Sequence, residues 1–192
     1  DPRSVGEHRQ AQLSPQRVAV EEARSGDVVI LTKPIGSGIV ATAVKADMAE
    51  AAVVEEVGGW LCLLNRHAAE LMMAHNPSAA TDVTGFGLLG HLCEMAAGAG
   101  VTMRLHTDRV PLFPTVPELI RDGLVPAGCY RNRDHYLPRL RTGATSEELL
   151  LALCDPQTSG GLLMAFAPAD AAAFMEAAAA AGCHAVEVGE VA

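Results

Sequence analysis

Short apolar runs typical of β-strands alternate along this chain with longer alanine- and leucine-rich segments typical of helices. The expected strands lie at 27–33, 79–83, 101–106, 161–167 and 184–191. A chain in which strands and helices interleave folds into layers of sheet and helix, because each sheet face must be covered. We therefore expect an α/β or α+β two-layer sandwich, with a mixed sheet and helices packed on it.

The segment 39–73 is rich in helix-forming residues, and its Gly58–Gly59 pair predicts a break between two helical pieces. The region 110–141 contains five prolines, which predicts mostly irregular structure around one short helix. Ser146 is a candidate N-cap. Helices are expected at 85–98, 116–122, 146–153 and 168–181.

The composition predicts one domain with a sizeable core, since 49% of the 192 residues are hydrophobic and 19% are charged. Fourteen basic and 23 acidic side chains give a formal charge of −9, and aromatic residues make up only 4%. Nucleic-acid binders use basic side chains for the phosphates and aromatic ones for stacking. No nucleic-acid partner is therefore expected, and an anionic ligand would need a bound cation or backbone N–H groups.

The cysteines and the apolar runs indicate the compartment. Five cysteines are an odd number, and no two are spaced as C-x-x-C, which predicts reduced thiols and neither a disulfide framework nor a zinc site. No apolar stretch approaches the ~18 residues of a membrane span, and the polar residues 1–16 lack the core of a secretion signal. We expect a soluble cytoplasmic protein with no membrane partner, in which 1–26 is a linker or the remnant of a preceding region and 27–192 is the folded lobe.

The segment 80–91 is the sharpest candidate for chemistry. Asp82 ends a predicted strand, and glycines follow at the mouth of a predicted helix. A carboxylate there can ligate a hard cation such as Mg²⁺, while uncapped helix N–H groups face anionic oxygens. Thr84, Gly85 and Gly87 are the candidate phosphate-facing positions. The alternative is that Asp82 or Thr84 only caps the helix, and that the glycines allow close packing.

The other polar clusters carry weaker signals. The turn-rich segment 155–161 is either an ordinary turn or a loop whose N–H groups line a phosphate-facing cleft. The segment 32–38 contains only G-x-G, which supports neither a P-loop nor a dinucleotide fingerprint. His91 has Glu94 three residues ahead and is expected to be a satisfied structural histidine. The local basic patch formed by Arg131, Arg133, Arg139 and Arg141 is expected to be a solvated loop, with an anion site as the alternative.

Four segments together resemble the C-terminal domain of selenophosphate synthetase (selenide, water dikinase), a family of the aminoimidazole ribonucleotide synthetase-like superfamily. They are Ile30–Gly38, Ala79–Leu92, Tyr130–Arg133 and Asp155–Leu163. This resemblance implies an ATP-dependent enzyme that converts selenide, ATP and water to selenophosphate, AMP and phosphate. It also implies that Asp82, at the matching position of the family's motif, ligates Mg²⁺ at a cleft between two domains.

The same resemblance implies a partner. The family's N-terminal ATP-binding domain, with its reactive Cys or selenocysteine and its companion Lys, has no counterpart in this sequence, so no catalytic residue is assigned here and the fragment alone is expected to be inactive. Dimers are typical of the family, although a lobe without its other domain can be monomeric. Two alternatives stay open: a non-catalytic docking or scaffold module, and a lobe of a related ATP-using synthetase.

Overall fold

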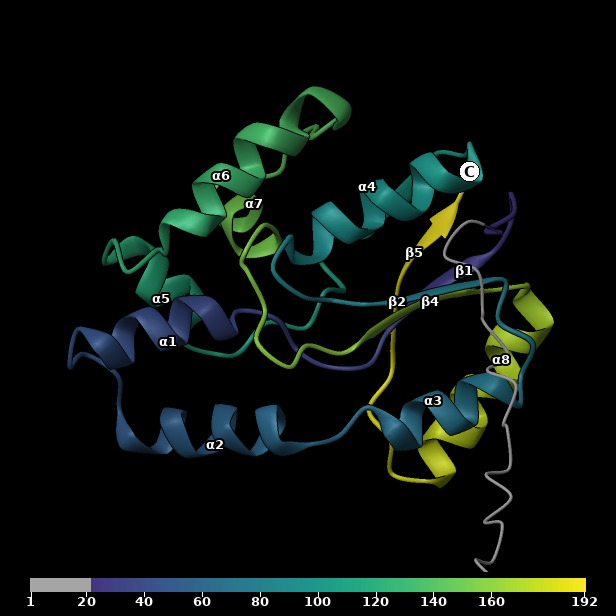
Figure 1. The fold of residues 1–192 in the computed structure, drawn as a ribbon, viewed down its shortest axis with the longest axis horizontal. Coiled ribbons are helices and arrows are strands. Elements are labelled where there is room, and N and C mark those ends of the chain that lie inside the picture. The colour runs from purple at the N-terminus through teal and green to yellow at the C-terminus, as the bar shows by residue number, and fades with distance from the viewer. Residues whose placement is uncertain (1–21) are drawn as a thin grey trace, which may run out of the picture.

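Helices cover both faces of a five-stranded sheet in the part of the chain that the computed structural model describes, residues 22–192 (Figure 1). The strands follow the order β2-β4-β1-β5-β3 across the sheet, and all four pairings are antiparallel. They are β1 (Val28–Leu31), β2 (Ala79–Asp82), β3 (Met103–Leu105), β4 (Leu162–Phe166) and β5 (Val186–Val191). The expected linker lies largely outside these residues.

The two central strands are apolar on both faces, which is why the sheet needs a helical layer on each side. Side chains of β1 alternate between the two faces: Val29 and Leu31 point to one, and Ile30 points to the other. The α/β class is confirmed. The helices form a layer on each face of the sheet, which is one layer more than the expected two-layer sandwich contains. The sheet is antiparallel where a mixed one was expected, because β4 and β5 run in the direction opposite to β1.

The helices divide between the two faces and one end of the sheet. Leucines of α4 and α7 pack on the first face, while Phe174 of α8 and Met72 of α3 pack on the second. A separate apolar cluster joins α1, α2 and α5 to α7 beside the sheet. The helices are α1 (Ser37–Lys45), α2 (Ala51–Cys62), α3 (Arg66–Met73), α4 (Gly87–Ala99), α5 (Val116–Arg121), α6 (Ala127–Tyr136), the short 3₁₀ helix η1 (Leu137–Arg139), α7 (Glu147–Leu153) and α8 (Pro168–Ala180).

The local signals of the last third of the chain are confirmed. The Ser146 hydroxyl accepts a hydrogen bond from the Leu149 N–H at 3.2 Å and so caps α7. Pro168 begins α8, and Gly182 follows its end with a φ of +64°. No helix among the described residues combines the length and apolarity that a bilayer crossing requires.

Two helix predictions are wrong. The segment 39–73 contains three helices, because α2 runs through Gly58 and Gly59, and the chain breaks instead at 46–50 and 63–65. Neither glycine has the positive φ that ends a helix, so the pair only weakens α2. The region 110–141 is also more regular than expected. Its prolines leave 127–137 free, and α6 forms there directly after Pro126.

Candidate functional site

Three loops that carry the sequence motifs meet at one edge of the sheet. β4 lies between β1 and β2 and is antiparallel to both, so the start of β4 lies beside the ends of its neighbours. The register pairs Leu31 with Leu163 and Asp82 with Leu162. The 32–36 loop, the 83–86 loop and the 154–161 loop therefore emerge side by side.

A buried polar network joins the first and third of these loops. Gln157 Oε1 accepts hydrogen bonds from the Gly36 and Ser37 N–H groups at 3.1 and 3.3 Å, and from the Ser37 hydroxyl at 3.0 Å. The Asp155 carboxylate accepts from the Gly38 N–H at 2.8 Å. The first N–H groups of α1, which its own side chains leave uncapped, are thus capped by the 154–161 loop. The 154–161 loop therefore has a structural role. The N–H groups at the start of α1 are occupied by it and are not open to an anion.

The Asp155 side chain is fully buried. Two further donors reach its carboxylate: Gln157 Nε2 at 2.9 Å, and the Cys129 thiol of α6 at 3.3 Å. Burial raises the pKa of Asp155 to about 6, although hydrogen bonds from Cys129, Gly38 and Gln157 act in the opposite direction. Burial and the neighbouring Asp155 likewise raise the pKa of Cys129, which leaves this thiol protonated and unsuited to nucleophilic attack.

Asp82 has a different environment from Asp155. It is exposed at the end of the edge strand β2, and no donor among residues 22–192 hydrogen-bonds to its carboxylate. It therefore neither caps α4 nor folds back on its own backbone, and the capping alternative finds no support in its contacts. Its oxygens are free to bind a cation from the solvent side.

The candidate phosphate-facing residues differ in accessibility. Gly85 is exposed. Thr84 is half-buried, and its N–H donates to His91 Nε2 at 3.0 Å. Gly87 is buried with a φ of +72°, its N–H donates to the Thr84 carbonyl at 3.0 Å, and a Cβ on it would lie 2.7 Å from the backbone of Cys154. Gly85 thus presents its backbone to solvent, whereas Thr84 and Gly87 shape the loop.

His91 is the structural histidine that the sequence predicts. It is buried, its Nε2 accepts from the Thr84 N–H, and its Nδ1 lies 3.4 Å from Glu94 Oε2. The ring proton therefore sits on Nδ1, toward Glu94. Burial lowers the pKa of His91, while the charges of Glu94 and Asp82 raise it, so the ring stays neutral at pH 7 and fixes the 83–86 loop.

Two residues of the motifs have roles that the sequence reasoning missed. Asn132 Nδ2 on α6 donates to the carbonyls of Gly85 and Cys154, at 2.9 and 3.0 Å. The buried Lys33 ammonium donates to the carbonyls of Leu63 and Ser159, at 2.6 and 2.9 Å. Burial lowers the pKa of Lys33. Both residues lie in segments that carry the family resemblance, and this position was the only sign of their importance in the sequence. The carbonyl groups that they join become known only from the folded structure.

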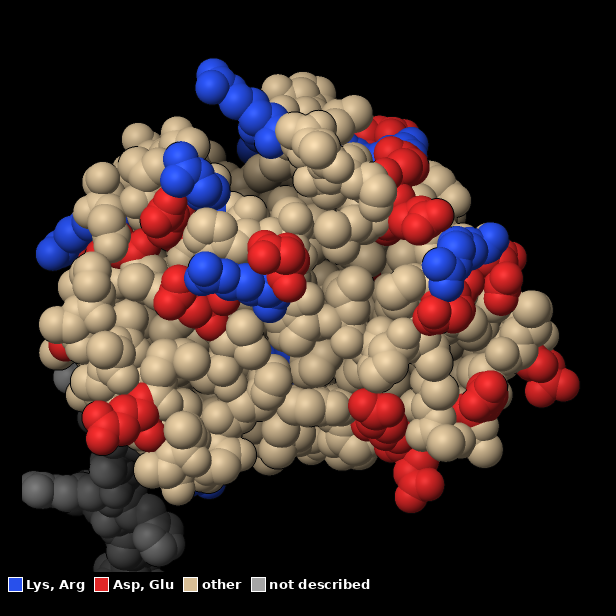
Figure 2. All heavy atoms as spheres, turned by 180° about the vertical axis from the view of Figure 1, so that it is seen from behind, with Lys and Arg blue, Asp and Glu red and all other residues tan. Residues whose placement is uncertain are grey.

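The charged surface does not surround Asp82 with a cluster of further cation ligands. No group of three or more His, Cys, Asp or Glu side chains able to hold a metal ion occurs within residues 22–192. Arg133 pairs with Asp134 and Glu147. The basic patch is not the expected loop, because Arg131 and Arg133 lie on α6 and Arg139 lies in η1. On the face shown in Figure 2, acidic side chains are scattered and basic ones lie in separate small groups. A metal at Asp82 would thus take one protein carboxylate from this chain, a number that suits Mg²⁺.

Solved structures share this fold. A thiamine-monophosphate kinase from Stenotrophomonas maltophilia matches 93% of this chain and 51% of its own, with a TM-score of 0.62 and 18% identity. A hydrogenase maturation protein, HypE, matches 93% of this chain and 48% of its own, with a TM-score of 0.61 and 19% identity. At this low sequence identity, the structural similarity establishes the fold alone.

Sequence comparison reaches closer relatives. A selenide, water dikinase from Trichlorobacter lovleyi is 56% identical over 88% of this chain, and selenide, water dikinase 2 from Peptoclostridium acidaminophilum is 43% identical over 79%. The chain spans about half the length of these curated relatives, 49% and 44%. Residues 24–192 match the family described as AIR synthase related protein, C-terminal domain. The chain therefore belongs to that family, and the predicted resemblance to the C-terminal domain of selenide, water dikinases is confirmed.

Proposed function

We propose that this chain is the C-terminal lobe of an ATP-dependent selenide, water dikinase, and that Asp82 supplies one carboxylate to Mg²⁺ at the interface with an N-terminal lobe. The single observation that carries this proposal is the exposed, unpartnered carboxylate of Asp82 at the end of β2, directly before a loop that His91 and Asn132 hold in place. The close relatives named selenide, water dikinase, of which this chain spans about half, support it. Selenide, ATP and the missing lobe are the proposed partners, and the whole protein is the proposed enzyme.

The surroundings of Asp82 suit a surface that another lobe covers. Phe86 beside it is 50% exposed, and Tyr130 on the neighbouring α6 is 40% exposed. An exposed aromatic side chain near a polar site suits a surface that another domain covers. Phe86 also packs against His91 and Tyr136, so the lobe presents it from a rigid base.

The chemistry assigned to this lobe is positioning. Bound Mg²⁺ would neutralise charge on the triphosphate of ATP. Asp82 would hold the cation from this side, and the exposed backbone at Gly85 would face phosphate oxygens. His91, Asn132 and the close contact of Gly87 with Cys154 keep the loop in place. The reactive groups belong to the absent lobe, so no residue here is given a catalytic role.

The test adds the missing N-terminal half in trans and measures selenophosphate by phosphorus NMR. Asp82→Asn should lower the rate at least about 100-fold and raise the Mg²⁺ concentration needed for half-maximal rate, because a ligand to the cation is lost. Asp108→Asn, an exposed carboxylate in a distant loop, is the matched control and should leave both unchanged. Restored activity indifferent to Asp82→Asn would instead support a scaffold lobe, and a different phosphorylated product would indicate a related synthetase.

A further inference from the structure

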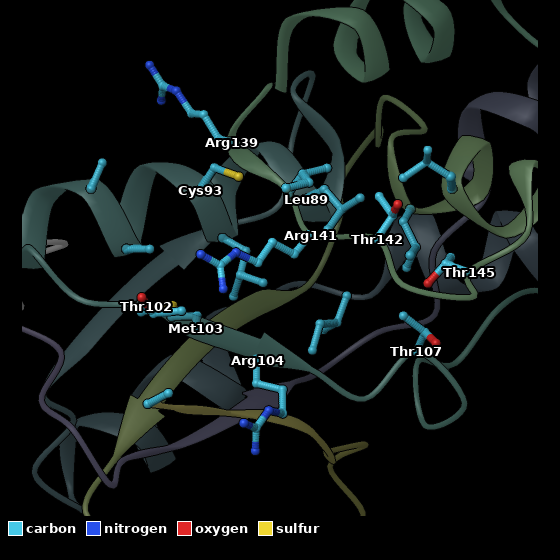
Figure 3. Close-up of a pocket in the computed structure, with 18 of the residues that line it drawn as sticks. Leu89, Cys93, Thr102, Met103, Arg104, Thr107, Arg139, Arg141, Thr142 and Thr145 are labelled. Carbon is cyan, nitrogen blue, oxygen red and sulfur yellow. The ribbon is translucent and has the colours of Figure 1, made fainter. Parts of the chain in front are cut away.

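A second concave site lies away from the three loops, between α4, β3 and the 139–145 segment that precedes α7 (Figure 3). Its volume is about 770 Å³, within the usual range for pockets that bind small organic molecules. None of its lining residues belongs to the loops around Asp82. Its apolar floor consists of buried leucines of α4 and α7, namely Leu89, Leu92, Leu150 and Leu153.

The polar part of this cavity is basic, in contrast to the acidic chain. Its lining contains three arginines and four threonines, and no Asp or Glu side chain. Arg104 is neutralised by Glu190 at 2.5 Å. Arg139 and Arg141 form no ion pair with any residue in 22–192. These two guanidinium groups make the charge around the cavity positive, although the chain as a whole has a net charge of −9.

The side chains are arranged as a head group site over an apolar floor. In Figure 3, Arg141 extends across the cavity, Arg139 points outward from its upper edge, and Thr142 and Thr145 lie on the side opposite the Arg141 guanidinium. The Cys93 thiol of α4 lies on the wall near Arg139. Arginine binds carboxylate and phosphate oxygens through paired N–H donors.

We propose that this cavity binds a small amphiphilic anion, with its anionic head at Arg141 and its hydrocarbon or aryl body against the leucines. Charge complementarity selects the head, and the four buried leucines select an apolar body over a free inorganic anion. This site is independent of Asp82 and of the proposed reaction.

The first experiment titrates the 192-residue chain with the aryl sulfonate 1-anilinonaphthalene-8-sulfonate and follows its fluorescence. We expect saturable binding of one probe per chain, displaced by decanoate or decyl phosphate but not by decanol. Arg141→Gln should weaken it about tenfold, because a charge-assisted contact is lost. Arg66→Gln, an exposed residue on α3 across the sheet, is the matched control and should have no effect.

A second variant separates shape from charge. Ala96→Phe, on the α4 wall of the cavity, keeps every charge but fills the space, and should also abolish saturable binding. Thermal melting checks that each variant is folded. Displacement by decanol as strong as by decanoate, or equal binding by the chain and both cavity variants, would overturn the proposal. A preference between decanoate and decyl phosphate identifies the head group.

A measurement on the unsubstituted chain locates the ligand directly. The Cys93 thiol lines the cavity, whereas Cys62 is exposed on α2. Alkylation by iodoacetamide at alkaline pH, mapped by mass spectrometry, should slow severalfold at Cys93 when decanoate is present, and stay unchanged at Cys62. Equal alkylation of Cys93 with and without saturating decanoate would place the ligand elsewhere and contradict the proposal.

Discussion

Asp155 is fully buried, and its donors come from α1, from α6 and from its own loop. Replacing it with alanine removes the acceptor and leaves these buried donors unpaired. Asp155→Ala should therefore lower the free energy of unfolding by about 3 kcal/mol, measured by urea denaturation. Asp122→Ala, an exposed carboxylate after α5, is the control and should change it by less than about 0.5 kcal/mol. Equal effects would show that the network contributes nothing.

The same carboxyl predicts a pH dependence. Burial raises the pKa of Asp155 from 3.8 to about 6, so between these values the folded chain retains a proton that the unfolded chain releases. The stability contributed by this group is therefore full below about pH 4 and is lost as the pH rises through about 6. The loss is on the order of 3 kcal/mol.

Asp155→Asn isolates this effect, because asparagine does not titrate. The difference in unfolding free energy between the unsubstituted chain and Asp155→Asn should shift against the unsubstituted chain as the pH rises from about 4 to about 7. Urea denaturation at several pH values gives this difference. A pH-independent difference, or one that shifts in the opposite direction, would contradict the raised pKa.

At the scale of the elements, Gly87 determines how α4 starts. Its positive φ and the 2.7 Å approach of a Cβ to the Cys154 backbone both exclude a side chain. Gly87→Ala should lower the free energy of unfolding by about 2–4 kcal/mol in urea denaturation. Gly85→Ala is the matched control, because no atom lies within 4 Å of a Cβ there, and it should cost far less. A tolerated Gly87→Ala would show that the two loops can separate.

For the glycine pair inside α2, replacement by alanine is expected to stabilise the fold, in contrast to Gly87→Ala. Gly58 and Gly59 lie within the helix, lack positive φ and have open space where the methyl group of an alanine would stand. The double replacement by alanine should therefore raise the free energy of unfolding by about 1–2 kcal/mol. Thermal melting and urea denaturation measure the gain. A loss of stability would mean that the pair has a packing role absent from the described contacts.

These elements also show how far the fold could be predicted from the sequence. Alternating apolar runs predicted all five strands, and capping residues predicted α7 and α8, because those signals act within a few residues. Gly58–Gly59 gave a wrong prediction, since whether a glycine ends a helix depends on its φ. The partners of Asp155, Lys33 and Asn132 could not be predicted, because each bond joins segments far apart along the chain. The exposure of Asp82 is likewise a property of the folded sheet edge.

At the scale of the whole molecule, a single Mg²⁺ ligand predicts weak Mg²⁺ binding and no ATP hydrolysis by this chain alone. The 192-residue chain should bind Mg²⁺ only at millimolar concentrations or higher and should not hydrolyse ATP, because one carboxylate leaves the cation mostly hydrated and no nucleophile is supplied. Calorimetry and phosphate release measure the two properties. Robust ATP turnover by the isolated chain, abolished by Asp82→Ala, would contradict the assignment of the reactive groups to the other lobe.

Every strand pairing in the sheet includes either β4 or β5. A ribosome therefore releases β1, β2 and β3 long before any of them has a hydrogen-bonding neighbour. Until residue 162 emerges, the three earlier strands of the nascent polypeptide have no hydrogen-bonding partner. The residues that cap α1, Asp155 and Gln157, have been synthesised only a few residues earlier. Sheet assembly must then wait for β4 and, for β3, for β5. A stop codon placed shortly before β4 would therefore yield a product without a sheet, dependent on chaperones and prone to aggregate.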